Sequence, residues 1–452
     1  MTLIFDIGKT HKKCLLFDAD YQLIELEEQR FAEIEDEDGF PCDDLTGILR
    51  WMEDRLDFFL KKYPAITHLN FSTYGASLVH VDQKGKPLTP LYNYLKPLPA
   101  DIRKRFYQLY GPAEKLAQET ASPALDMLNS GLQLYWLKHS QPEVFARIHR
   151  SLHFPQFLGF YFSGKAGHDA TSLGCHTALW DFGKKAYHAW VQAEKLAPLF
   201  PAPELLPTTS SITYQDKKLM IGYGLHDSSA ALYPYLKASD TPFVLLSTGT
   251  WSIALNPFQD APLTQEELAQ DVLFYLQPDQ RPVKAARLFL GKEHEVKVAD
   301  LVEFYGVDKN AYRQVAFSPE RTKALKKQES RHFVWQQLPG PGPTHASWQS
   351  LSDFTTAYHQ LLIELVDRQV QSLRLIWPDL NKQRLIIEGG FAKNGLFLAL
   401  LQQALPEVEI FTAETAHGSA LGAALIMESK PLHSDFLSEN YSLRKYQGSR
   451  GA

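Results

Sequence analysis

Two short glycine turns carry small hydroxylated residues directly after apolar segments. The first, Asp6-Ile7-Gly8-Lys9-Thr10, follows Leu3-Ile4-Phe5, and the second, Ser247-Thr248-Gly249-Thr250, ends an apolar run from Phe243. A glycine between two strands lets backbone N–H groups approach an anion closely, and a hydroxyl adds a further donor. Either turn alone is equally well explained by an ordinary β-hairpin. Two turns of one design, one in each half of the chain, indicate a phosphate chain held from both sides.

Three charged side chains accompany the first turn. Asp6 stands at the end of a predicted strand, where its carboxylate could hold a hydrated Mg²⁺ ion. Magnesium favours a carboxylate together with waters and substrate phosphates. Lys9 or Lys13 could add positive charge beside the same anion.

A further carboxylate, Asp227, stands between a strand-like segment ending at His226 and a run of small residues. A carboxylate at a helix N-terminus is often only a cap. The functional interpretation is a general base that accepts a proton from a substrate hydroxyl during phosphoryl transfer. His226 is explained equally well as a buried, hydrogen-bonded histidine and as a substrate contact.

Two glycine-rich segments follow in the second half. Gly389-Gly390, with Asn394 after it, could admit a flat ring or a phosphate against the backbone, although a tight strand-to-helix connection explains it as well. The small residues of the run 418–424 are best explained by close helix packing. The acidic loop at residues 35–39 lacks the spacing of a calcium loop, and we predict a solvated surface turn there.

These residues need strands and helices to position them, and the apolar periodicity supplies both. Strands are predicted at residues 3–5, 14–17, 21–27, 68–72, 243–247, 251–255, 385–388 and 408–411. Helices are predicted at residues 45–59, 127–162, 354–375, 395–404 and 419–427. Asp43 or Asp44 could cap the first helix. The alternation predicts an α/β fold, and the strand–glycine turn–strand layout of residues 3–17 recurs at 243–255.

Composition excludes several classes of protein. The 452 residues carry a formal net charge of -6, whereas a nucleic-acid binder more often has a basic surplus. Three scattered cysteines form no CxxC pair, which argues against a disulfide framework and a cysteine zinc site. No apolar run reaches the roughly 20 residues that span a bilayer, and the N-terminus has no signal-peptide pattern. We expect a cytoplasmic protein. Pro-rich segments at 198–207 and 338–343 are predicted to be a connector and a loop.

The order of these motifs resembles that of the FGGY carbohydrate kinases, most of all the branch of L-rhamnulose and L-fuculose kinases. The resemblance covers nearly the whole chain. It rests on the two phosphate turns, Gly75-Ala76-Ser77, Gly224-Leu225-His226-Asp227, Gly389-Gly390 with Asn394, and the run 420–424. The departures from the family pattern are Lys9 for Thr, Phe391 for a small residue, His417 for Glu, and Tyr92-Asn93-Tyr94-Leu95-Lys96 for Trp-x-Asp-x-Arg.

The resemblance implies an α/β protein of two actin-like, ribonuclease H-like ATPase domains with the active site in the cleft between them. Residues 1–236 would bind the sugar and supply the catalytic base, and residues 237–452 would bind the nucleotide. The implied reaction is ATP-dependent phosphorylation of a sugar hydroxyl, the primary hydroxyl of a (deoxy)ketose such as L-rhamnulose or L-fuculose. A kinase for another pentulose or polyol, such as ribulose or xylulose, and a non-catalytic actin-like sugar- or nucleotide-binding regulator remain alternatives.

The resemblance also assigns roles to individual residues. Asp227 is implied to be the catalytic base and Asp6 the metal ligand, with ATP and Mg²⁺ as cofactors and a monomer or homodimer as the assembly. The implied sugar contacts are Gly75, Ala76, Ser77, His226 and Asp227. The implied ATP contacts are Gly8, Lys9, Thr10, Lys13, Thr248, Gly249, Thr250, Gly389, Gly390 and Asn394.

Overall fold

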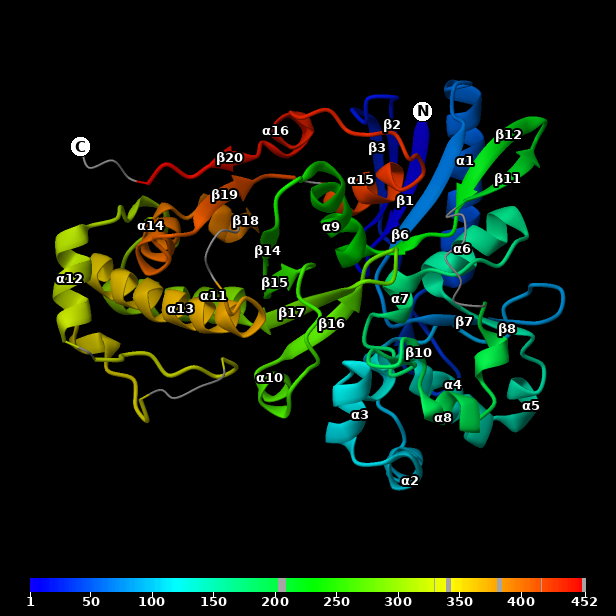
Figure 1. Cartoon of the computed structure of the whole chain (residues 1–452), viewed down its shortest axis with the longest axis horizontal. Helices are drawn as coiled ribbons and strands as arrows, with labels where there is room; N and C mark the ends of the chain where they lie inside the picture. Colours follow the sequence, from blue (N-terminus) through cyan, green and yellow to red (C-terminus); the bar gives the residue numbers. More distant parts are fainter. Residues whose placement is uncertain (202–208, 329, 339–342, 380–383, 416, 449–452) are drawn as a thin grey trace.

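Two mixed β-sheets, each flanked by helices, form the framework of the computed structural model (Figure 1). The structure describes residues 1–201, 209–328, 330–338, 343–379, 384–415 and 417–448. Most of the Pro-rich connector predicted at 198–207 and of the loop predicted at 338–343 lies outside these residues. Among the described helices, none is long and apolar enough to cross a membrane.

The first sheet is built around the strand that ends at Asp6. β1 (Thr2–Ile7), β2 (Lys12–Phe17) and β3 (Leu23–Gln29) form an antiparallel meander, and β6 (His68–Thr73) pairs with β1 in parallel. The register places Asp6 opposite Lys13 on one side and Ser72 on the other. The sheet is completed by β11 (Thr209–Tyr214), β12 (Lys217–Gly222) and β13 (Leu225–His226).

The second sheet repeats this plan around the second glycine turn, as the layout of the sequence predicted. β14 (Phe243–Thr248), β15 (Ser252–Asn256) and β17 (Pro282–Leu288) form the meander, and β18 (Arg384–Gly389) pairs with β14 in parallel. Thr248 therefore lies opposite Gly389. The sheet also contains β16 (Val272–Leu276), β19 (Glu409–Ala413) and β20 (Arg444–Lys445).

Helices cover both sheets, and short two-stranded ladders lie beside them. The α-helices are α1 (Leu45–Lys62), α2 (Ala100–Tyr110), α3 (Ala113–Thr120), α4 (Ser130–Ser140), α5 (Pro142–Phe145), α6 (Phe154–Ser163), α7 (Ala170–Leu173), α8 (Ala189–Ala193), α9 (Asp227–Ala238), α10 (Gln265–Ala269), α11 (Leu290–Tyr305), α12 (Pro319–Lys327), α13 (Phe354–Ile376), α14 (Gly395–Ala404), α15 (Gly418–Leu425) and α16 (Phe436–Tyr441). The ladders join β4 (Ile34–Glu35) to β5 (Pro41–Cys42), β7 (Leu78–Val81) to β8 (Arg150–His153), and β9 (Trp180–Asp181) to β10 (Ala186–Tyr187).

Helix α1 shows how the local sequence sets these elements. Its apolar positions at helical spacing are all buried, which fixes the face that packs on the first sheet. Of the two possible caps, Asp44 accepts the Gly47 N–H at 2.9 Å. Asp43 is not the cap, because its carboxylate is engaged with Lys12 instead.

The prediction of continuous helix over residues 127–162 is wrong in its middle. The chain there forms α4 and α5, then the strand β8, which pairs with β7, and only then α6. Pro142 and Pro155 each stand in the first turn of a new helix. Proline is tolerated there because its missing N–H would have no partner in the first turn, whereas it breaks a helix interior.

The acidic loop at residues 35–39 is the exposed surface turn that we predicted, with the exception of Asp36. The Asp36 side chain is fully buried and accepts the Lys96 ammonium at 2.6 Å. It also accepts the backbone N–H groups of Asp38 and Phe40. Lys96 lies over the Trp136 ring, 5.0 Å from its centroid. Lys96, in the segment 92–96 that differs from the family pattern, therefore holds the acidic loop in place.

Helices α9 and α15 lie between the two sheets (Figure 1). They pack so closely that a Cβ atom on Gly422 of α15 would lie 1.8 Å from the Ala230 carbonyl oxygen of α9. The carbonyl of Ala423 accepts the side-chain amide of Asn70 on β6 at 2.8 Å. On the other side, the Tyr235 hydroxyl of α9 donates to the Glu388 carboxylate of β18 at 2.9 Å. The two helices therefore connect the first sheet to the second.

Candidate active site

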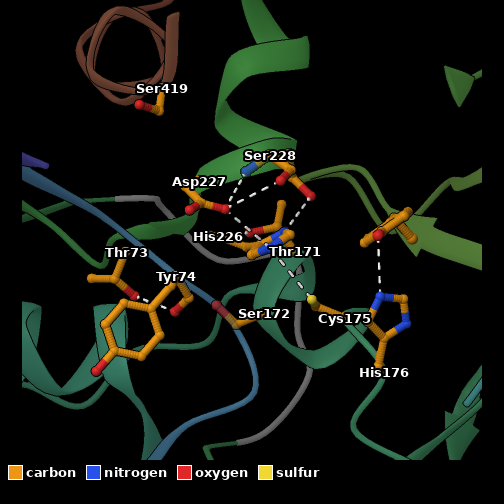
Figure 2. Close-up of polar contacts among 12 residues, drawn as sticks. Thr73, Tyr74, Thr171, Ser172, Cys175, His176, His226, Asp227, Ser228 and Ser419 are labelled. Atoms are coloured by element: carbon orange, nitrogen blue, oxygen red, sulfur yellow. Dashed lines mark hydrogen bonds and ion pairs between the residues drawn. The ribbon is translucent and has the colours of Figure 1, made fainter. Parts of the chain in front are cut away.

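The carboxylate of Asp227 lies at the first position of α9, where β13 ends (Figure 2). Its Oδ1 accepts the Ser228 N–H at 2.6 Å and lies 3.2 Å from Nε2 of His226. The side chain remains about one-third exposed, at 34%. Asp227 is therefore oriented by its neighbours and still open to a ligand.

His226 is held behind this carboxylate rather than on an open surface. Its Nε2 lies 3.3 Å from Cys175 Sγ and its Nδ1 lies 3.2 Å from Ser229 Oγ. Its ring stacks on Tyr275 of β16, with centroids 5.8 Å apart. Burial disfavours the charged ring, but Cys175 and then Asp227 outweigh burial and raise the pKa of His226 to about 9. These contacts orient Asp227 and leave the ring buried.

Asp6 lies near Asp227, and the two carboxylates influence each other. Burial and then the charge of Asp227 raise the pKa of Asp6 to about 6, while hydrogen bonds from Ser419 and Ser72 partly offset the rise. Ser419, in the first turn of α15, donates to Oδ2 of Asp6 at 3.0 Å. Two neighbouring carboxylates repel each other, and this arrangement favours a bound cation.

Lys9, which replaces a hydroxylated residue of the family pattern, is engaged elsewhere. Its ammonium lies 2.7 Å from Asp43 Oδ2 and 2.9 Å from Glu33 Oε1. Asp43 also binds Lys12 at 2.8 Å and accepts the Tyr74 hydroxyl at 2.8 Å. In this arrangement, Lys9 ties the first turn to the segment before α1.

The segment Gly75-Ala76-Ser77 divides in its placement. Gly75 lies against Cys175 and His226, because a Cβ atom there would lie 2.7 Å from Cys175 Sγ and 3.0 Å from the His226 ring. Ala76 is buried with φ of 58°, and its carbonyl accepts Gln133. Ser77 is buried at 2% exposure. The structure thus brings Gly75 beside His226, the neighbour of Asp227, and places the Ser77 side chain in the interior.

A cavity of about 370 Å³ joins Asp227 to the second sheet. Its wall includes residues of α9, β14, β15, β18 and the start of α15. They are Asp227, Ser228, Ala231, Leu245, Ser247, Ile253, Leu255, Glu388, Gly389, Thr415, Gly418 and Ser419. We call it the phosphate cavity, because it lies between the carboxylate of Asp227 and the end of β18 that carries Gly389.

A second cavity of about 470 Å³ lies directly beyond Gly389. Its lining consists of glycines, aromatic rings and a few polar groups, namely Gly249, Gly291, His294, Tyr312, Arg313, Val315, Gly390, Phe391, Lys393, Asn394 and Gly395. We call it the base cavity. The neighbours Gly389 and Gly390 line different cavities, so together the two cavities have the extended shape that a nucleotide requires.

Thr248 holds the boundary between these cavities. Its hydroxyl donates to the Glu388 carbonyl at 2.5 Å and accepts the Phe391 N–H at 3.0 Å. A Cβ atom on Gly389, whose φ is 85°, would lie 1.8 Å from the Thr248 carbonyl oxygen. The Thr248 hydroxyl is therefore engaged in hydrogen bonds within the protein. Thr10 and Thr250 are exposed, and Gly249 lines the base cavity.

Sequence reasoning missed several residues of this site. Ser419 was assigned to plain helix packing, although a serine in the first turn of a small-residue helix was a usable signal. Cys175, His294, Tyr312 and Tyr358 belong to no motif. They reach the site through helix faces and segments distant in sequence.

Comparison with known proteins identifies the class to which this fold and site belong. A carbohydrate kinase structure from Novosphingobium aromaticivorans superposes with a TM-score of 0.80 at 24% identity, covering 99% of this chain and 94% of that one. The likeness confirms the predicted fold of two actin-like ATPase domains.

Family models then cover both halves of the chain. Residues 1–228 match the N-terminal domain of the FGGY family of carbohydrate kinases, and residues 240–434 match its C-terminal domain. The chain belongs to the FGGY family of carbohydrate kinases.

Two curated relatives resemble the branch suggested by the sequence. A rhamnulokinase of Halalkalibacterium halodurans is 24% identical over 261 residues, 56% of this chain and 55% of the relative. An L-fuculokinase of Escherichia coli K12 is 25% identical over 193 residues, 41% of this chain and 40% of the relative. The chain thus matches about half the length, or less, of these curated relatives.

Proposed function

We propose that this chain transfers the γ-phosphate of ATP to a sugar hydroxyl, the primary hydroxyl of a (deoxy)ketose such as L-rhamnulose or L-fuculose. One observation carries the proposal: Asp227, oriented but partly exposed, lies on the wall of the phosphate cavity, which adjoins the base cavity at Gly389 and Gly390. Family membership and the two partly aligned curated relatives support the reaction and the sugar class.

In this proposal Asp227 accepts the proton of the attacking hydroxyl, and the hydroxyl oxygen attacks the γ-phosphorus in line. The two turns donate backbone N–H groups of Lys9, Thr10 and Thr250 to the phosphate oxygens, since the N–H groups of Gly8 and Gly249 already donate to the carbonyls of His11 and Trp251. Residues 1–236 bind the sugar, and residues 237–452 bind the nucleotide. The exclusion of water by the cleft prevents hydrolysis from competing with transfer.

We further propose that Asp6 holds Mg²⁺, which would neutralise phosphate charge when bound. The donor set fits, since this ion is usually bound by one or two carboxylates, waters and substrate phosphates. Asp6 fits this role because a cation would relieve the repulsion between its carboxylate and that of Asp227.

The test is ADP release measured over a panel of L-rhamnulose, L-fuculose, L-ribulose, D-ribulose and D-xylulose, with glycerol as a control. We expect one of the deoxyketoses to have the highest kcat/KM. Asp227→Asn should fold and bind ATP but lose sugar-dependent turnover by at least about 1,000-fold. Retained turnover in that variant would refute the role of Asp227. ATP binding by the wild type without ADP release on any sugar would favour the regulator instead.

A further inference from the structure

His294 lines the base cavity and takes part in a directed chain of hydrogen bonds that begins at a helix cap. Asn394 precedes α14, and its side-chain oxygen accepts the Phe397 N–H at 3.0 Å. Because the oxygen is committed to the cap, the amide nitrogen of Asn394 is the group that faces Tyr358. It donates to the Tyr358 hydroxyl oxygen at 2.8 Å.

This chain fixes the position of the proton on His294. The Tyr358 oxygen accepts from Asn394, and among the described residues the only acceptor for its single hydrogen is Nε2 of His294, at 3.0 Å. Nε2 is then an acceptor, and in a neutral ring Nδ1 must carry the hydrogen. Burial lowers the pKa of His294 to about 4, so the ring is neutral at physiological pH. No described residue hydrogen-bonds to Nδ1.

The rest of the base cavity fits a flat ring. Phe391 and Tyr312 lie 5.2 and 5.5 Å from the His294 ring, between centroids. A Cβ atom on Gly395 would meet nothing within 4 Å, and one on Gly390 only the Thr248 carbonyl, at 4.0 Å. Neither residue has positive φ. The packing of the protein therefore does not require glycine at positions 390 and 395. A ligand that lies flat against the backbone at these positions would require glycine, because a side chain would block its approach.

We propose that His294 is the base-reading residue of this site, donating from Nδ1–H to a ring nitrogen of the purine of the bound nucleotide. Tyr358 is a positioning residue that acts through His294 by setting its tautomer. Phe391 supplies the apolar wall, which explains a large side chain where the family pattern has a small one. This inference rests on the proposed nucleotide-dependent function.

The test measures nucleotide binding by calorimetry, without turnover, on wild type and His294→Phe, using ATP and its 1-deaza, 3-deaza and 7-deaza analogues. We expect His294→Phe to weaken ATP binding about 5- to 10-fold, as loss of one neutral hydrogen bond does. One of the three analogues should bind the wild type about 5- to 10-fold more weakly than ATP does. The same analogue and ATP should bind His294→Phe with equal affinity. His433→Phe, the same change at an exposed position, should bind ATP like the wild type.

Two further measurements test the role of His294 even if His294→Phe does not fold. The analogue series on wild type alone must contain one analogue that binds at least about 5-fold more weakly than ATP. Tyr358→Phe should lose part of the affinity for ATP and most of the discrimination between ATP and that analogue. Equal binding of ATP and all three analogues by the wild type overturns the role of His294 alone. No ATP binding at all overturns the proposed function itself.

Discussion

At the scale of single residues, some side chains of the site belong to recognisable sequence motifs, and others are brought together only by the fold. Asp6 and Asp227 stand at strand and helix ends, where the sequence pattern indicated chemistry. Lys9 shows the limit of that reasoning, because it occupies a phosphate motif and binds Asp43. A turn sequence predicts its own backbone, but it does not predict which distant carboxylate its side chain will meet.

The raised pKa of Asp6 leads to a stability prediction with a defined sign. A carboxyl whose folded pKa is about 6, against an ordinary value of 3.8, binds its proton more tightly when folded. Its contribution to stability is therefore largest at low pH and is lost as pH rises through about 6. Asp6→Asn should raise the free energy of unfolding at pH 8 by about 1 to 3 kcal/mol, and by less at pH 5.

Urea unfolding of wild type and Asp6→Asn at both pH values checks this prediction. The same variant should lose the Mg²⁺ dependence of nucleotide binding, because the side chain no longer offers a carboxylate. A variant that is less stable than wild type at pH 8 would show that the charged form of Asp6 is favoured by the fold.

Lys9 gives a second prediction at this scale. Lys9→Met leaves Asp43 with Lys12 and Tyr74 but removes one partner of a buried carboxylate, so we expect about 1 to 2 kcal/mol of destabilisation. The dissociation constant for ATP should change less than about twofold. Lys13→Met is the matched comparison, since Lys13 lies opposite Asp6 and should weaken ATP binding more. A large loss of ATP affinity in Lys9→Met would mean that Lys9 reaches the phosphates.

At the scale of elements, apolar periodicity predicted the central strands of both sheets near their observed bounds, namely β1, β2, β3, β6, β14, β15, β18 and β19, together with the helices α1, α13, α14 and α15. It gave no prediction for the sheet strands β11, β12, β16 and β17 or for the long helix α11. It failed at β8, a strand of four residues, Arg150–His153, that stands between two helices. Helix and strand patterns are ambiguous over such short runs. The small residues of the run 418–424 were predicted to allow close helix packing, and α15 does pack closely on α9. The same helix also places Ser419 within hydrogen-bond distance of Asp6.

The contact between α9 and α15 gives the element-scale prediction. Gly422→Ala would place a Cβ atom 1.8 Å from the Ala230 carbonyl oxygen, so the helices must separate. We expect at least about 2 kcal/mol of destabilisation and a lower kcat, because α9 carries Asp227 and α15 carries Ser419. Gly183→Ala, whose Cβ would lie 3.4 Å from its nearest neighbour, is the control. Thermal unfolding and ADP release check both variants, and wild-type values for Gly422→Ala would contradict the close contact.

At the scale of the whole molecule, the repeated meander and the two-domain fold were predictable because both halves show the same layout. The contacts between the halves were not. Tyr275 of β16 stacks on His226, and its hydroxyl lies 3.1 Å from His176 Nε2. Arg287 approaches the same nitrogen and pairs with Asp271. These residues come from separate segments without a shared spacing, so no sequence pattern predicts their contact.

The stack across the halves gives the last prediction. Tyr275→Leu removes the ring that lies flat against His226, which in turn orients Asp227, so we expect kcat to fall about 10-fold or more. Tyr275→Phe keeps the ring and loses only the contacts of the hydroxyl with His176 and Arg287, so its kcat should fall less than about threefold. Steady-state kinetics with the best sugar of the panel separates the two. Equal losses would show that the hydroxyl, and not the ring, transmits the effect.

The position of α15 has a consequence for how the protein is made. This helix packs on α9, hydrogen-bonds β6 through Asn70 and reaches Asp6 through Ser419, a partner 413 residues away in sequence. At about 5 to 20 residues per second, Asp6 of β1 is synthesised roughly 20 to 80 seconds before Ser419 of this helix. During that time the apolar surfaces of β1 and β6 lack their cover. The nascent N-terminal half is therefore the form that chaperones must protect, and any truncation before residue 418 would make that exposure permanent.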